Sequence, residues 1–127
     1  MPQKRILVVD DDAGIADFLS SFLTQKGFAV EAVYSGVEAE KIAQDWRPHL
    51  VLLDIMMPIQ DGYTTLEALI KENDKLPVLM ITSLDDIESG KKALELGAAD
   101  YITKPLDLEY LEHSVLGKLG VFLAEVD

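Results

Sequence analysis

The chain has 127 residues and a formal net charge of −12, from 11 Lys and Arg residues against 23 Asp and Glu residues. A chain of this length is expected to form one domain, and it can bury about two-thirds of its unfolded surface without disulfides or a structural metal. The absence of cysteine excludes zinc ribbons, thiol redox chemistry and secreted disulfide scaffolds. The negative charge argues against direct nucleic-acid binding, because phosphate contacts require a surplus of Lys and Arg.

The N-terminal segment does not have the pattern of a targeting or membrane segment. The apolar run at residues 6–9 is short, and three aspartates follow it directly. A secretory signal needs roughly 7–15 apolar residues and a membrane span about 20. We therefore expect a cytoplasmic protein that has no membrane partner.

Three continuous apolar runs predict buried strands, at residues 6–9, 50–53 and 78–81. None of these runs alternates with polar residues, which is typical of parallel strands that helices cover on both faces. Two weaker strands are expected at residues 28–33 and 101–103.

Apolar residues at helical spacing predict a helix after each strand, and each set shares a face that we expect to point inward. The first and second sets are Ile15, Phe18, Leu19, Phe22 and Leu23, then Ala39, Ile42, Ala43 and Trp46. The third, fourth and fifth sets are Tyr63, Leu66 and Ile70, then Ile87, Gly90 and Leu94, then Leu108, Leu111, Val115, Leu119 and Phe122. Ser35 and Glu38 form a capping box, and Asp107 is placed to cap the last helix. Gly117 and Gly120 are expected inside that last helix. The alternation of strands and helices predicts a doubly wound α/β sheet.

Polar residues that could bind a ligand or take part in a reaction lie at the carboxyl ends of the predicted strands, where open α/β sheets bind ligands. In chain order they are Asp10, Asp11, Asp12, Asp54, Thr82 and Lys104. Carboxylates that share a site repel one another unless a cation neutralises them, and oxygen ligands without His or Cys favour Mg²⁺. A lysine ammonium and a threonine hydroxyl beside them would stabilise a phosphoryl group, which an aspartate can accept as a nucleophile.

Each of these residues also has an ordinary structural explanation when it is taken alone. The aspartates are common at strand ends, turns and helix caps, the threonine can simply end a strand, and the lysine can be solvated. The structural explanations weaken for the set as a whole, because all its members fall at one edge of one sheet.

Short motifs at these strand ends follow one another in a specific order. They are Ile6-Leu7-Val8-Val9-Asp10-Asp11, Leu52-Leu53-Asp54-Ile55-Met56-Met57-Pro58, Asp61-Gly62, Met80-Ile81-Thr82-Ser83, Gly97-Ala98 and Tyr101-Ile102-Thr103-Lys104-Pro105. The ordered set resembles the response-regulator receiver domain of two-component signalling, essentially from end to end. The resemblance implies a flavodoxin-like sheet of five parallel strands in the order 2-1-3-4-5, flanked by five helices. It implies a receiver domain over residues 1–127, with no effector domain in this chain.

The resemblance also implies a role for individual acidic residues. Asp54 corresponds to the phosphoacceptor. Asp10, Asp11, Asp54 and the backbone carbonyl of Met56 correspond to the protein ligands of Mg²⁺, with Asp11 binding the ion directly and Asp10 acting mainly through water.

Three further residues correspond to the groups that respond to the phosphoryl group. Thr82 would hydrogen-bond it, and Lys104 would pair with it, with a cis peptide bond between Lys104 and Pro105. Thr82 and Tyr101 correspond to the switch residues of the family.

The function implied by the resemblance is that of a phosphoacceptor signalling module rather than an enzyme. A sensor histidine kinase or histidine phosphotransfer protein would donate the phosphoryl group, and the chain would catalyse only its own phosphorylation and dephosphorylation. The switched domain would control an unidentified output partner or effector domain. We expect a monomer or weak dimer, because the last helix lacks the basic residues that many transcriptional receivers use for pairing.

Two other interpretations stay open on the sequence. Asp10 and Asp12 after an apolar strand resemble the nucleophile and acid/base of haloacid-dehalogenase-type phosphatases, although Asp54 then has no role. A degenerate receiver that serves only as a binding scaffold is the second, although the full set of site residues argues against it.

Overall fold

The computed structural model describes residues 3–55, 61–83 and 86–120, in which strands and helices alternate along the chain. The strands are β1 (Arg5–Val9), β2 (Ala29–Val33), β3 (Leu50–Asp54), β4 (Val78–Ser83) and β5 (Asp100–Lys104). The helices are α1 (Ala13–Gln25), α2 (Gly36–Trp46), α3 (Gly62–Glu72), α4 (Ile87–Glu95) and α5 (Leu108–Lys118). The predicted alternation is confirmed, including the two weaker strands.

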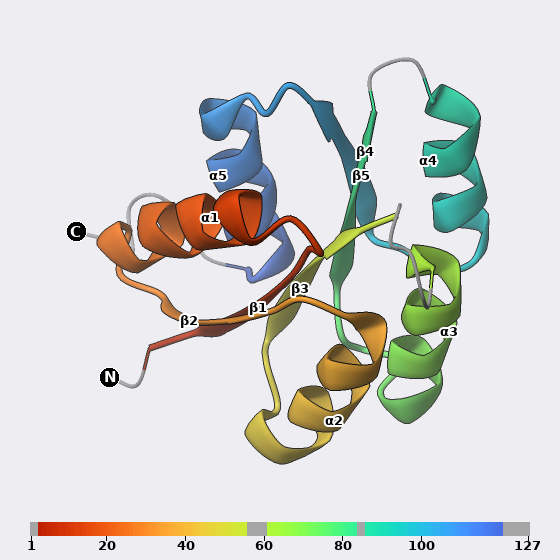
Figure 1. Ribbon diagram of the computed structural model, residues 1–127, viewed down its shortest axis with the longest axis horizontal. Helices are drawn as coiled ribbons and strands as arrows, with labels where there is room; N and C mark the ends of the chain where they lie inside the picture. The colour runs from red at the N-terminus through yellow and green to blue at the C-terminus, as the bar shows by residue number, and fades with distance from the viewer. Residues whose placement is uncertain (1–2, 56–60, 84–85, 121–127) are drawn as a thin grey trace.

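The five strands form one sheet in the order β2-β1-β3-β4-β5 (Figure 1). Every pairing between neighbouring strands in this order is parallel. The strand order expected from the family resemblance is therefore confirmed. Because β1 and β3 are adjacent, their carboxyl ends open at the same edge of the sheet.

Two hydrophobic cores cover the two faces of the sheet, because successive residues of a strand point to opposite sides. The odd-numbered residues of β1 and β3 pack with α2, α3 and α4, and the even-numbered ones pack with α1 and α5. Figure 1 shows these two groups of helices on opposite sides of the sheet. Strands that are buried on both faces need apolar side chains at every position, which explains their continuous apolar runs.

The inward faces of α1 and α4 differ from the predicted ones. Phe18 is 53% exposed, and Ala16 takes part in the core in its place. On α4 the buried residues are Gly90 and Ala93, whereas Ile87 and Leu94 are exposed. The helix therefore meets the sheet through its smallest side chains, which allows a close approach that apolar periodicity alone does not reveal.

Two of the predicted helix caps are confirmed, and one helix end is corrected. The Ser35 side chain accepts from the Glu38 amide at 3.2 Å, and the Asp107 carboxylate accepts from the Tyr110 amide at 3.2 Å. Helix α5 ends at Lys118, and Gly120 lies beyond it with φ of 71°. A glycine in this left-handed conformation is a common way to end a helix, so the expectation that Gly120 is helical was wrong.

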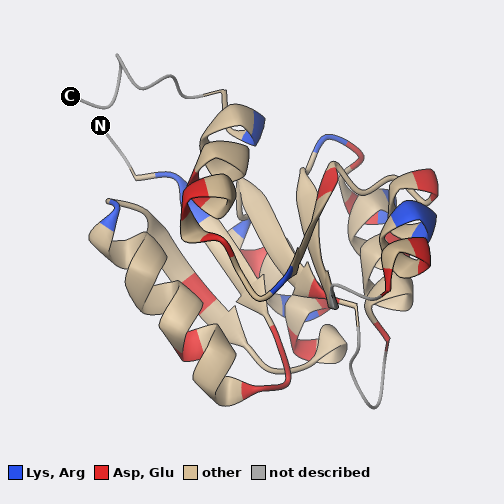
Figure 2. Cartoon of the chain, turned by 90° about the horizontal axis from the view of Figure 1, so that it is seen from above, with Lys and Arg blue, Asp and Glu red and all other residues tan. Residues whose placement is uncertain are grey.

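The charged residues are distributed over the helices and loops, with Lys and Arg scattered among the more numerous Asp and Glu (Figure 2). Among the described residues, no helix is both long and apolar enough to cross a membrane. The tightest acidic grouping in the same residues lies at the carboxyl ends of β1 and β3.

Candidate functional site

Three carboxylates meet at the carboxyl edge of the sheet. Asp10 and Asp11 follow β1, and Asp54 is the last residue of β3. One carboxylate oxygen from each of the three lies within 4.8 Å of the others. Val9 pairs with Leu53 in the sheet, so the parallel register itself places these aspartates side by side. The convergence predicted from the sequence is confirmed.

Two of these three carboxylates are buried. Asp10 is fully buried and Asp54 nearly so, while Asp11 is exposed. Asp10 Oδ1 accepts from the Asp12 amide at 2.9 Å, but Asp10 Oδ2 is buried without a hydrogen-bond partner. A buried carboxylate oxygen that lacks a partner is costly, and a cation bound between these carboxylates would offset that cost.

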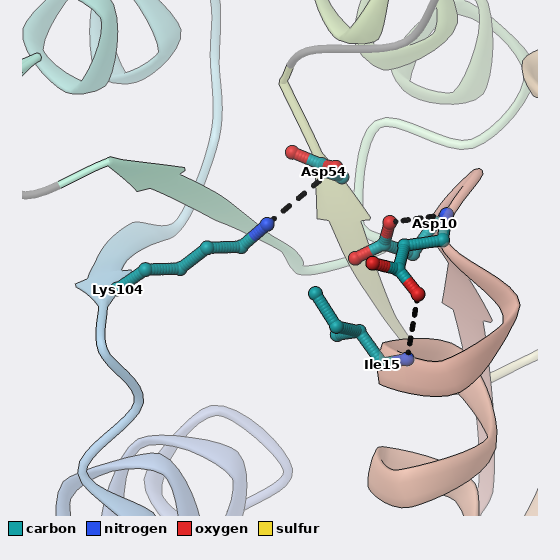
Figure 3. Close-up of polar contacts among 5 residues, drawn as sticks. Asp10, Ile15, Asp54 and Lys104 are labelled. Carbon is teal, nitrogen blue, oxygen red and sulfur yellow. Dashed lines mark hydrogen bonds and ion pairs between the residues drawn. The ribbon is translucent and has the colours of Figure 1, made fainter.

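Lys104 brings a cationic group to these carboxylates. Its Nζ lies 3.8 Å from Asp54 Oδ2, with the ammonium reaching across from the end of β5 (Figure 3). The peptide bond between Lys104 and Pro105 is cis, as expected. One ammonium against three carboxylates leaves the edge of the sheet with an excess of negative charge.

The two candidate switch residues both contact α4. Thr82 is buried at the end of β4, and its hydroxyl donates to the Asp86 carbonyl at 3.3 Å. Asp86 is the N-cap residue of α4. The Tyr101 ring lies against Gly90, in the middle of the same helix. Thr82 and Tyr101 are therefore linked through the position of α4.

The donor atoms of the acidic group fit a hard divalent cation. All three described ligand candidates are carboxylates, and no His or sulfur ligand takes part in the described group. Mg²⁺ binds through one or two carboxylates, keeps several waters and accepts phosphate oxygens. The unpartnered oxygen of Asp10 supports the same assignment. Met56, whose carbonyl was predicted as a further ligand, lies outside the described residues.

Asp12 lies apart from the acidic group and acts as a helix cap. It is exposed, and its Oδ1 accepts from the Ile15 amide at 3.2 Å at the start of α1. The ordinary structural explanation therefore holds for this third consecutive aspartate. The metal assignment consequently rests on Asp10 and Asp11 rather than on Asp12.

Sequence reasoning missed how closely α3 approaches the site. A Cβ on Gly62 would lie 2.6 Å from the backbone oxygen of Asp54, and the Gly62 amide donates to the Ile55 carbonyl at 2.9 Å. On the sequence, Asp61-Gly62 is only one of the motifs of the family resemblance, with no role of its own in the site. The glycine is required here because the helix starts directly against the main chain of the candidate phosphoacceptor.

Comparison with known proteins assigns the chain to a family. The family model described as the response regulator receiver domain matches residues 6–116. The chain belongs to this family. The receiver domain is 44% identical over 110 residues to a probable transcriptional regulator, ycf27, from Cyanophora paradoxa, a match that covers 87% of the chain and 46% of that protein. It is 37% identical over 125 residues to the DNA-binding dual master transcriptional regulator RpaA from Synechocystis, covering 97% of the chain and 50% of that protein.

The fold assignment is supported by solved structures. A CheY-like response regulator receiver domain protein from Methanospirillum hungatei superimposes with a TM-score of 0.88 at 31% identity, over 94% of this chain and 95% of that one. The receiver domain thus matches an isolated receiver over nearly its whole length, and it spans about half the length of the curated relatives it matches. The chain is accordingly a signalling module of two-component response regulators.

Proposed function

We propose that Asp54 accepts a phosphoryl group in this receiver domain. The observation that carries the proposal is the Lys104 ammonium 3.8 Å from Asp54 Oδ2, at an edge that also holds Asp10 and Asp11. In the transfer, an Asp54 carboxylate oxygen attacks phosphorus, a P–O bond forms, and the P–N bond of a donor phosphohistidine breaks with its electron pair passing to the imidazole nitrogen. The product is an aspartyl phosphate.

We propose that Asp10, Asp11 and Asp54 hold Mg²⁺ during this reaction. The bound ion would neutralise the carboxylates and orient the phosphoryl oxygens. The buried Asp10 side chain fixes the geometry through its hydrogen bond from the Asp12 amide. The exposed Asp11 keeps the site open to solvent on one side, which leaves room for the waters that Mg²⁺ retains.

The remaining polar groups act on the charge of the transferred phosphoryl group. The Lys104 ammonium already faces the Asp54 carboxylate, so it stays paired with the same position when that oxygen carries phosphate. The Thr82 hydroxyl is held by the Asp86 carbonyl and would exchange this partner for a phosphoryl oxygen. That exchange is the step that converts a local charge change into a movement of α4.

The donor in this proposal is a histidine kinase or a histidine phosphotransfer protein, and the output is a protein partner or a further domain. The relatives named as transcriptional regulators are about twice as long as this chain. DNA binding is part of the name of one of these longer proteins, and we do not propose it for this receiver domain. The cytoplasmic location predicted from the sequence is the setting in which such a donor would act.

The phosphatase alternative is less well supported. It requires Asp12 to exchange protons with a substrate held by Asp10, but the Asp12 carboxylate caps α1 and lies outside the acidic group. The scaffold alternative gives no reason for the Lys104–Asp54 pair or for the buried Asp10 oxygen that lacks a hydrogen-bond partner.

The experiment compares two aspartate variants with the unsubstituted chain, using acetyl phosphate and Mg²⁺. Asp54→Asn should abolish incorporation of base-labile phosphate, whereas the control Asp12→Asn should incorporate it at close to the normal level. Undiminished labelling of Asp54→Asn would overturn the assignment. A third variant, Asp10→Asn, tests the phosphatase alternative, in which Asp10 is the nucleophile: loss of labelling there with retention in Asp54→Asn would favour the phosphatase chemistry instead.

A further inference from the structure

Side chains from β4, β5 and α3 contact helix α4. The Thr82 hydroxyl donates to the Asp86 carbonyl at its N-cap, and the Tyr101 ring packs on Gly90. The third contact comes from Tyr63 on α3, whose hydroxyl donates to the Ser89 carbonyl at 3.1 Å. Figure 1 shows α3 and α4 as neighbours on the same side of the sheet.

Tyr63 makes a second contact with α4 through its ring. The Lys92 ammonium lies 4.4 Å from the ring centroid, within the range of a cation–π interaction. Ser89 and Lys92 are one turn apart on the same helix, so the phenol contacts α4 with both its edge and its face. One side chain of α3 therefore contacts α4 at two residues, through a hydrogen bond and a cation–π interaction.

Tyr63 is also connected to the proposed phosphoacceptor, Asp54, through the preceding residue. Gly62, the residue before Tyr63, donates to the Ile55 carbonyl at 2.9 Å and leaves no room for a side chain beside the Asp54 carbonyl. Tyr63 is thus fixed relative to the main chain of Asp54, while Ser89 is fixed relative to the partner of Thr82. The two sides of the candidate site are connected through α3 and α4 as well as through the sheet.

We propose that Tyr63 is a positioning residue that holds α4 in the arrangement where the Thr82 hydroxyl is bound to Asp86. This inference rests on the proposed function of Asp54. Phosphorylation draws the Thr82 hydroxyl toward the phosphoryl group, so Asp86 must release it. Each contact that stabilises the present position of α4 opposes this release. The hydrogen bond from Tyr63 to Ser89 accordingly biases the receiver domain toward the unphosphorylated arrangement.

The size of the bias follows from the strength of a single hydrogen bond. A neutral hydrogen bond contributes a factor of roughly five to a conformational equilibrium. Removing only the hydroxyl should therefore increase the population of the released arrangement about fivefold. The affinity for a ligand that binds the released arrangement should rise by a similar factor while that arrangement is the minor one.

The experiment uses Tyr63→Phe, which deletes the hydroxyl and keeps the ring over Lys92. Tyr34→Phe is the matched control, because the Tyr34 hydroxyl donates to Asp17 Oδ1 at a similar 3.1 Å between β2 and α1, away from α4. Beryllofluoride with Mg²⁺ serves as the phosphoryl mimic. Its affinity is measured by titration, and the amide resonances of Thr82 and Gly90 are followed by NMR before and after saturation.

We expect Tyr63→Phe to bind beryllofluoride about fivefold more tightly, and the free variant to have Thr82 and Gly90 shifts displaced toward their saturated positions. Tyr34→Phe should match the unsubstituted chain in both measurements. An unchanged affinity and unchanged shifts in Tyr63→Phe, together with a lower melting temperature, would show a structural role alone and overturn the inference. Failure of the unsubstituted chain to bind beryllofluoride at all would instead overturn the proposed function.

Discussion

Gly90 of α4 and Tyr101 of β5 pack so closely that there is no space for a side chain at position 90. A Cβ there would lie 2.5 Å from the Cδ2 atom of the Tyr101 ring and 2.7 Å from its Cγ. Both are atoms near the base of the ring, which cannot move aside without a new rotamer of Tyr101 or a shift of α4. This contact explains why α4 faces the sheet with its smallest residues.

Gly90→Ala should therefore destabilise the receiver domain even though alanine favours helices. Overpacking at a site of this kind costs about 1–3 kcal/mol, which exceeds the gain of up to about 1 kcal/mol in helix propensity. The free energy of unfolding from urea titrations checks this expectation. A variant as stable as the unsubstituted chain would show that α4 and Tyr101 can move apart to accept a methyl group at little cost in free energy.

Gly117→Ala is the matched control and should have the opposite sign. Gly117 also lies within a helix, but a Cβ there would meet nothing within 4 Å. The substitution should stabilise the domain by about 0.5–1 kcal/mol, because alanine loses less backbone entropy than glycine on folding. Destabilisation of both variants would point to a general effect on the helices rather than to the packing of Tyr101.

Asp10→Asn should stabilise the domain in the absence of Mg²⁺ and remove its response to the ion. The change deletes one of three carboxylates whose oxygens lie within 4.8 Å of one another, which relieves their repulsion. In the unsubstituted chain, Mg²⁺ at a hundred times its dissociation constant should add about 2.7 kcal/mol to the unfolding free energy. Thermal melts with and without Mg²⁺ measure both effects.

The control for this prediction is Asp12→Asn. Asp12 is exposed and caps α1 without joining the acidic group, so its amide variant should retain the full stabilisation by Mg²⁺. An equal loss of the Mg²⁺ response in the two variants would mean that the ion is attracted by net charge alone.

The strands were predictable because their physical requirement is visible in the sequence. A strand covered on both faces needs consecutive apolar residues, and the runs at 50–53 and 78–81 satisfy this requirement. The additional residues at the ends, such as Asp100 and Lys104 in β5, were not predictable. They are strand residues because the neighbouring strand offers them backbone hydrogen bonds. This backbone pairing cannot be read from the polarity of the side chains.

The helix faces were only partly predictable. Periodicity groups apolar residues by angle, but the sheet decides which part of the apolar arc is covered. On α1 the covered residues are Ala16, Leu19 and Leu23, and Phe18 falls outside the covered arc. On α4 a glycine and an alanine are covered because the helix packs closely, and neither contributes strongly to an apolar pattern.

The candidate site was also only partly predictable from the sequence. The convergence of Asp10 and Asp54 was predictable, since parallel strands end at one edge and their order places β1 beside β3. The partner of the Thr82 hydroxyl and the reach of Tyr63 to Ser89 were not predictable. Both are contacts with backbone carbonyls of α4, and every residue carries such a carbonyl.

His49 should make the stability of the domain depend on pH in mildly acidic solution. Its Nδ1 accepts from the Arg5 amide at 2.9 Å, which requires an unprotonated nitrogen. Partial burial, followed by the charges of Arg5 and Lys4, lowers the pKa of His49 from its ordinary value of 6.5. The folded state therefore resists protonation, and the unfolded state takes up the proton first as the pH falls.

The sign of the effect follows from proton linkage. Stability increases with pH wherever the unfolded state binds more protons, so the contribution of His49 is complete above pH 6.5. It is lost as the pH falls below this value, until the folded state is protonated as well. Urea titrations from pH 7.5 to about 5 should show a smaller decline in His49→Gln than in the unsubstituted chain. A decline of equal size in the two proteins would contradict this expectation.

Phe18→Ala should slow phosphorylation by a histidine kinase and leave phosphorylation by acetyl phosphate unchanged. Phe18 is 53% exposed, and it lines a cavity of about 500 Å³ together with Lys104, Pro105 and Leu106. In the proposed reaction, a protein that brings a phosphohistidine to Asp54 would approach beside Lys104, where this apolar surface is exposed. Acetyl phosphate needs no protein–protein contact to react at Asp54, so the loss of this apolar surface should not affect it.

The expected decrease with the kinase is about fivefold or more, because aromatic residues at protein interfaces commonly contribute over about 1 kcal/mol when truncated. About half of the ring is solvated, so the free energy of unfolding of the variant should fall by no more than about 1.5 kcal/mol. Val37→Ala is the control, an exposed apolar residue at the start of α2 that does not line this cavity. Both rates are measured with a kinase that phosphorylates the unsubstituted chain. An equal decrease in the rate with acetyl phosphate would contradict this expectation. It would show that Phe18 affects the reaction at Asp54 itself rather than the docking of the kinase.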